Sequence, residues 1–262
     1  MALFIVIAST TGAGPIYRQT PAPSVRGYVY ESTETVPGRP GHGYRTEFDL
    51  QNSGGTVYAI VRKSMVLDGS WKAVEPDDAC RAAMHGDESS LARVKLSPLS
   101  AEAARTLGDS FLATCAPPGI FFPLTDILNV VLIPTAHFRA TELRTVGQSL
   151  RYPGFAAAFD RGVAIKETSP GGEISVASLD SKHAVLDWKP DLAHLEIVEK
   201  ASKSPVTLVG TEHFAFRVVV DRKTGLLERA AASFDELDMK VVDAPDSVPH
   251  VHITRTVEIR PR

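Results

Sequence analysis

The chain has 262 residues, of which 44% are hydrophobic and 23% are charged, which is typical of a globular protein and excludes a disordered polymer. Its 28 Lys and Arg residues against 31 Asp and Glu residues leave a net charge of -3. No broad positive field is therefore available to hold a phosphate backbone, and nucleic acid is excluded as the expected partner.

The N-terminus carries an apolar run at residues 2–8, followed by small residues and by two prolines within residues 19–24. This order is typical of the end of a secretory signal and the extended segment after its cleavage site, although no Lys or Arg precedes the run. An ordinary buried strand is the alternative. We expect a signal-like remnant and leader over residues 1–24, export to the periplasm or cell envelope, and no transmembrane segment, because the run is too short to cross a bilayer.

The two cysteines, Cys80 and Cys115, are an even number and suit an oxidising compartment. A bridge between them would close a long loop and contribute on the order of 3–4 kcal/mol. Two small buried thiols are the alternative. Neither cysteine has a second Cys or His at the spacing of structural zinc motifs, so the sequence predicts a disulfide and no metal.

The residue pattern of positions 27–67 is typical of β-strands. Four side chains alternate with charged ones, as a half-buried strand requires: Tyr44, Thr46, Phe48 and Leu50. A turn sequence at residues 52–55 then leads into a second strand-like run at 56–63. A β-hairpin is the economical interpretation.

A helical insert is expected at about residues 75–135. Acidic residues and a proline at 75–78 open a first helix that stops near residue 86. A short strand is expected at 91–96. Ser100 then caps a second helix that ends close to Cys115.

The most apolar segment of the chain is residues 120–133, which carry one charge. Pro123 is expected to start a helix there, and its apolar residues recur at helical spacing. The β-branched end of the segment allows a strand as the alternative. A helix would either fill the core or line an apolar cavity. The candidate cavity residues are Phe121, Phe122, Leu124, Ile127, Leu128 and Val131. Asn129 falls inside the segment, where a buried amide must find partners.

From residue 139 onward, strand signals recur at short intervals. Strands are expected at 154–159, 162–167 and 173–179, with turns at 160–162 and 169–172, and then at 183–188, 192–199 and 213–220. A turn at 221–225 leads into a return strand. The last strand has Val251, Ile253, Val257 and Ile259 on one face. Repeated antiparallel hairpins are implied.

The sequence contains none of the common fingerprints of hydrolases, P-loop enzymes, zinc proteases or dinucleotide enzymes. His250 and His252 share one face of the last strand, but no third metal ligand is identifiable. The acids of residues 235–238 are expected in a solvated turn. We therefore expect no catalytic residue, no metal and no cofactor.

Four further polar residues are scattered over several expected elements: His183, Asp187, His194 and His213. Their convergence would support an enzyme, a hydrolase or lyase with a polar site at the rim of the sheet.

One stretch of the chain consists of the strand pattern from Phe214 to Val220, the turn Asp221-x-x-Thr224-Gly225, the return strand and Leu237-Asp238-Met239. This stretch resembles exported envelope proteins with the half-barrel fold of bacterial lipoprotein carriers. The resemblance covers about residues 150–242. It implies a curved antiparallel sheet around helices with a sheltered apolar cavity. It implies no catalytic residues for this chain. The segment from Phe121 to Ile133 would match the cavity, while the long helical middle departs from the simplest members.

We thus expect one α+β domain over residues 25–262, a large curved, half-barrel-like antiparallel sheet with a helical insert. The expected function is non-catalytic binding of a lipid-like or other apolar ligand in a bacterial envelope, with an envelope protein as a further partner. The alternatives are the rim-site enzyme and a purely structural or interaction protein.

Overall fold

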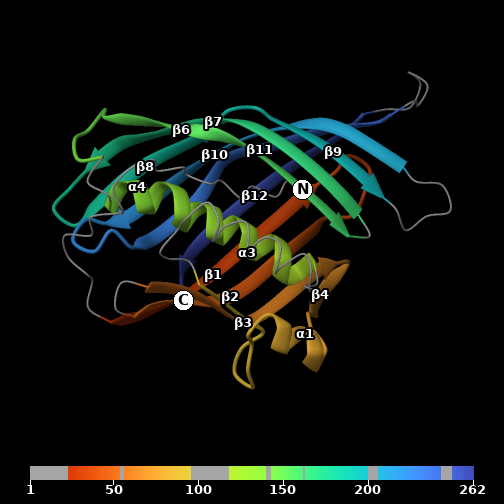
Figure 1. The fold of residues 1–262 in the computed structure, drawn as a ribbon, viewed down its shortest axis with the longest axis horizontal. Coiled ribbons are helices and arrows are strands. Elements are labelled where there is room, and N and C mark those ends of the chain that lie inside the picture. The colour runs from red at the N-terminus through yellow and green to blue at the C-terminus, as the bar shows by residue number, and fades with distance from the viewer. Residues whose placement is uncertain are drawn as a thin grey trace.

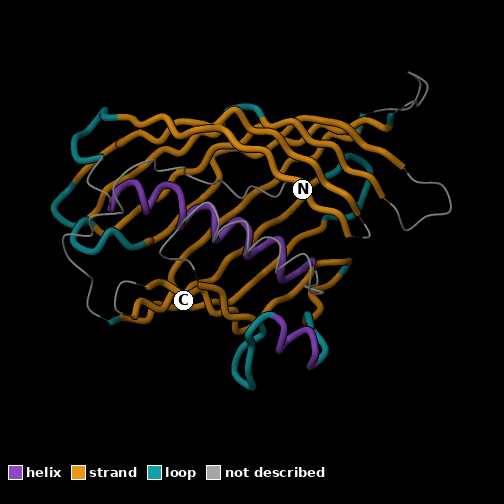
Figure 2. Tube along the Cα trace, in the orientation of Figure 1, coloured by secondary structure: helices purple, strands orange, loops and turns teal. Residues whose placement is uncertain are grey.

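The computed structural model describes residues 23–53, 56–95, 118–139, 143–161, 163–199, 206–242 and 250–262. Within them the protein is mostly antiparallel β-sheet, and helix is a minor component (Figure 2). The expected α+β class is therefore corrected to a mainly β fold, because most of the chain finds its backbone hydrogen bonds between strands. The leader over residues 1–24 lies almost wholly outside the described residues.

Twelve strands form one open sheet. In chain order they are β1 (Ser24–Thr35), β2 (His42–Ser53), β3 (Thr56–Asp68), β4 (Ser70–Ala73), β5 (Ala92–Lys95), β6 (Ser149–Arg161), β7 (Val163–Leu179), β8 (His183–Pro190), β9 (Ala193–Glu199), β10 (Val206–Asp221), β11 (Leu227–Val241) and β12 (Val251–Pro261). Their order is β4-β3-β2-β1-β12-β11-β10-β8-β7-β6, with β5 beside β3 and β9 beside β10 and β7. Figure 1 shows this sheet bending over one long helix.

The hairpin predicted from the strands at residues 44–50 and 56–63 is confirmed as β2 and β3, and the four predicted inward side chains of β2 are buried. The register shifts where Glu47 and Phe48 pair with β3, which leaves Arg62 as an extra residue. Because side chains alternate in a strand, one extra residue exchanges the two faces. Val61 before the bulge and Ser64 after it therefore both point into the interior.

The predicted turn at residues 169–172 is wrong, because β7 runs through it as one strand. β8 and β9 lie end to end between β7 and β10: β8 pairs with one half of each long strand and β9 with the other half. Residues 191–192 separate β8 from β9, and there the Asp191 N–H donates to the Gly171 carbonyl over 2.7 Å. Gly171 has a φ of 105°, which suits a glycine within this long strand.

The helices are short, apart from one. α1 (Asp78–Ala83) is the predicted first helix, and the Asp77 carboxylate accepts from the Cys80 N–H over 2.7 Å as its N-cap. The long helix runs through α3 (Pro118–Val130), the π-helix η1 (Val131–Thr135) and α4 (Ala136–Arg139). The expected helix from Ser100 to Cys115 lies outside the described residues.

α3 begins at Pro118, so the expected start at Pro123 is wrong, and Pro123 lies inside the helix. A proline has no N–H for the carbonyl four residues earlier, here that of Gly119. The Ser64 hydroxyl on β3 donates to this carbonyl instead. A Cβ at Gly119 would lie 2.6 Å from Val66 and Val74, so this glycine allows the helix to approach β3 closely.

The core lies between α3 and the sheet and is rich in aromatic rings. Tyr28 stacks on Phe48 with ring centroids 5.3 Å apart. Trp188 packs against Phe214 at 5.4 Å and donates its indole N–H to the Tyr152 hydroxyl over 3.0 Å. Among the described residues, no helix has the length and hydropathy needed to cross a membrane.

Candidate functional site

α3 crosses the concave side of the sheet, along β1, β2 and β3 (Figure 1). The residues from Pro123 to Val131 are all buried, which is the property of a helix enclosed on every side. Four predicted cavity residues belong to the core cluster: Leu124, Ile127, Leu128 and Val131. Phe122 is half-buried with its ring 5.8 Å from that of Tyr44, and the side chain of Phe121 lies outside the description. Their role as cavity lining stays a prediction.

Asp126 is the charged residue of this apolar helix, and it is buried. Its carboxylate accepts a hydrogen bond of 2.6 Å from the Tyr30 hydroxyl on β1. It also accepts one of 2.7 Å from Nη1 of Arg255 on β12. Two strands of the sheet thus hold one carboxylate of the helix.

Arg255 lies in the face of β12 that the sequence assigns to the interior, between Ile253 and Val257. Its side chain is 8% exposed, and besides Asp126 it binds Asp235 of β11 at 2.6 Å. Arg255 was not among the functional residues predicted from the sequence. Its position could have revealed it: an arginine stands on the apolar face of an alternating strand. A buried arginine needs buried anions as partners, so this position predicts a charged cluster in the core.

Asp235 was expected in a solvated turn, and this expectation is wrong: the residue is buried in the middle of β11. The cause is a bulge. Ala215 pairs with Phe234 but Phe216 pairs with Ala232, which leaves Ser233 without a facing residue on β10. The inward face therefore changes from even to odd positions, and Asp235 points into the core with Leu237 and Met239.

Glu212 on β10 completes the cluster. Its side chain is 2% exposed, and Oε1 lies 3.9 Å from Nη2 of Arg255. Its other oxygen, Oε2, has no hydrogen-bond partner among the described residues. A buried polar atom without a hydrogen-bond partner destabilises the fold, so the presence of Oε2 in the core calls for a physical explanation.

The cluster, defined as Asp126, Glu212, Asp235 and Arg255, contains three carboxyl groups and one guanidinium. If all were ionised, a net charge of -2 would be buried, which low-dielectric surroundings oppose. Burial, followed by repulsion from Asp235, raises the pKa of Glu212 well above its ordinary value of 4.5. Burial also raises the pKa of Asp235, against the attraction of Arg255. The raised pKa favours the protonated, neutral form of Glu212 in this cluster.

The residues considered for an enzyme are not brought together. His183 faces Asp221 across the β8–β10 pair, and His213 lies eight residues earlier on β10. At about 3.3 Å per residue the two histidines are roughly 26 Å apart along the strand. His183 contacts Asp180 at 3.4 Å, while the ring of His213 packs on Phe234 at 4.6 Å.

The other polar candidates also have separate surroundings. Asp187 binds Arg217 at 2.9 Å, and His252 binds Asp238 at 2.7 Å. His194 and His250 line a pocket on the outer face of the sheet. No group of three or more possible metal ligands occurs in the described part of the chain.

Comparison of the chain with protein-family models, curated proteins and solved structures gave no match.

Proposed function

We propose that this is an exported envelope protein that binds an apolar, lipid-like ligand on the concave side of its sheet, at the place where α3 lies. One observation carries the proposal: a helix with an enclosed apolar surface occupies the concavity, and its charged attachment to the sheet is confined to Asp126. This supports the carrier-like role that the resemblance implies.

The concave face needs an apolar cover, since its rings and aliphatic side chains would otherwise face water. Tyr28, Phe48 and Trp188 are each at most 1% exposed. Burial of apolar surface stabilises by about 25 cal/mol per Å², whether the cover is a helix or a ligand. An acyl chain of matching area is therefore a physical substitute for α3.

The composition of the cluster lowers the electrostatic cost of replacing α3 by a ligand. When α3 leaves, Asp126 moves into water and Arg255 keeps Asp235 at 2.6 Å. In the protonated form that the raised pKa of Glu212 favours, the group left on the sheet is neutral, so departure of the helix leaves no unpaired buried charge. The pairing of Asp235 with Arg255 and the neutral form of Glu212 are thus consistent with a helix that a ligand can displace.

The test compares two leucines of similar exposure, Leu128 on α3 at 7% and Leu226 beside the β10–β11 turn at 8%. If α3 covers a ligand site, Leu128→Ala changes the affinity for an environment-sensitive apolar dye and leaves the circular dichroism intact. Leu226→Ala loses stability without changing dye affinity. The proposal fails if the native wild type binds no dye, or if both variants change dye affinity equally.

Native mass spectrometry of the protein purified from its own envelope supplies an independent test. A retained lipid supports the proposal. An empty protein that also binds no dye would favour a structural or interaction role. The rim-site enzyme gains no support, since His183 and His213 lie far apart.

A further inference from the structure

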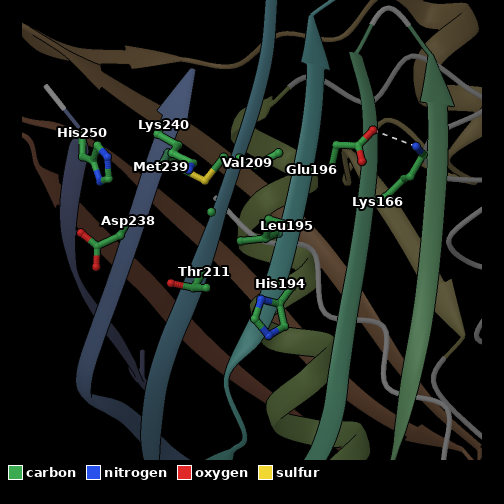
Figure 3. A pocket seen from close by; sticks show the side chains of 11 residues that line it. Lys166, His194, Leu195, Glu196, Val209, Thr211, Asp238, Met239, Lys240 and His250 are labelled. Atoms are coloured by element: carbon green, nitrogen blue, oxygen red, sulfur yellow. Dashed lines mark hydrogen bonds and ion pairs between the residues drawn. The ribbon is translucent and has the colours of Figure 1, made fainter. Parts of the chain in front are cut away.

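A pocket of about 570 Å³ opens between the ends of β9, β10 and β11, beside the start of β12 (Figure 3). It lies on the outer face of the sheet, because the exposed side chains of its lining alternate with Leu195 and Met239, which belong to the core. The charged and polar side chains of its lining are those of Lys166, His194, Glu196, Thr211, Asp238, Lys240 and His250.

The two acidic residues of the lining already have cationic partners. Glu196 binds Lys166 at 2.7 Å. Asp238 binds His252 at 2.7 Å, and this hydrogen bond raises the pKa of His252 and so favours its charged form. The negative charge of the pocket is therefore balanced by groups at its edge.

The remaining polar groups are hydrogen-bond donors without partners in the described part of the chain: Lys240, His194, His250 and Thr211. They come from adjacent strands. Thr211 faces His194 on one side and Asp238 on the other, and Lys240 faces Val209 in the next row. Neighbouring strands are about 4.8 Å apart, so these donors lie within reach of one small molecule.

We propose that this pocket binds the phosphate group of a small organic phosphate, with Lys240 as the principal charge and His194, His250 and Thr211 as further donors. The volume suits a small molecule better than a lone ion. Lysine binds phosphate as a point charge, and histidine and threonine side chains can donate hydrogen bonds to its other oxygens. The site is separate from the concave side, so it stands without the proposed apolar function.

The experiment is a calorimetric titration of the full chain with glycerol 3-phosphate at low salt. Saturable binding is expected, and Lys240→Gln should weaken it by about tenfold or more, since a charge-assisted hydrogen bond is lost. The matched control is Lys189→Gln, an exposed lysine of β8 outside the pocket, which should bind like the wild type. Circular dichroism verifies that both variants fold.

A second arm identifies the source of the phosphate. Sedimentation with vesicles containing phosphatidylglycerol should show binding that Lys240→Gln reduces if the ligand is a lipid headgroup. Binding of glycerol 3-phosphate without binding to vesicles indicates a soluble ligand. The inference is overturned if neither probe binds, or if Lys240→Gln binds both as the wild type does.

Discussion

Arg255 on β12 and Asp126 on α3 form an ion pair of 2.7 Å in the interior, joining residues that are 129 positions apart in the chain. Both side chains are less than 10% exposed. This pair connects the helix to the sheet, and Asp235 and Glu212 share the same guanidinium.

Removing the guanidinium should cost more than removing the helix carboxylate. Arg255→Gln leaves three buried carboxyl groups without a cation and should lower the free energy of unfolding by about 3–5 kcal/mol. Asp126→Asn leaves Arg255 paired with Asp235 and should cost less, about 1–3 kcal/mol. Urea denaturation at pH 7 measures both values.

The control for this pair of variants is Arg217→Gln, which breaks an exposed ion pair with Asp187 and should cost at most about 1 kcal/mol. If Arg255→Gln and Asp126→Asn lowered the free energy of unfolding equally, Arg255 and Asp235 would not form a stable ion pair on the sheet in the absence of the Asp126 carboxylate.

Glu212 should make the protein less stable as the pH rises. Its pKa is raised in the folded protein, so the folded state keeps a proton that the unfolded chain releases above about pH 4.5. The contribution is fully present below that pH and is lost by up to about 1.4 kcal/mol per pH unit until the folded pKa is passed.

Glu212→Gln, a neutral isostere, should remove this loss. The difference in unfolding free energy between variant and wild type should therefore grow in favour of the variant as the pH rises above about 5. Exposed Glu258 on β12 offers the control substitution Glu258→Gln. A difference that is flat with pH would show that Glu212 is ionised in the folded protein.

Ser64 and Pro123 should be energetically coupled. Ser64→Ala removes the donor to the Gly119 carbonyl and should cost about 1–3 kcal/mol, because a buried acceptor is left unsatisfied. In a Pro123→Ala background the backbone N–H of residue 123 can bind the same carbonyl, so Ser64→Ala should cost less. A double-mutant cycle by thermal denaturation measures the coupling, and strict additivity would rule out this role for Ser64.

Cys80 is buried in α1, and its expected partner Cys115 lies outside the described residues, so the disulfide stays a prediction. The exported protein should contain no free thiol when titrated under denaturing, non-reducing conditions. Two titratable thiols would exclude the bridge.

Local patterns were enough to predict much of the sheet. The alternation of Tyr44 to Leu50 predicts an inward face that the structure confirms, because a strand facing a core has a period of two. The turn at residues 221–225 is confirmed as well: the Asp221 carboxylate accepts from the Thr224 N–H over 2.7 Å, and Gly225 has a φ of 68°. Such features depend on neighbours within a few residues.

The charged cluster could not be predicted in this way, because its members come from α3, β10, β11 and β12. Asp235 reaches the interior only through the bulge at Ser233, and a bulge depends on the pairing of β11 with its neighbours. The turn expected at residues 169–172 was wrong for the same reason, since β8 and β9 together extend β7 past its glycines. Composition thus determined a globular chain and alternation determined its strands. Long-range pairing alone decided which polar side chains share the interior, because one extra residue in a strand exchanges its two faces.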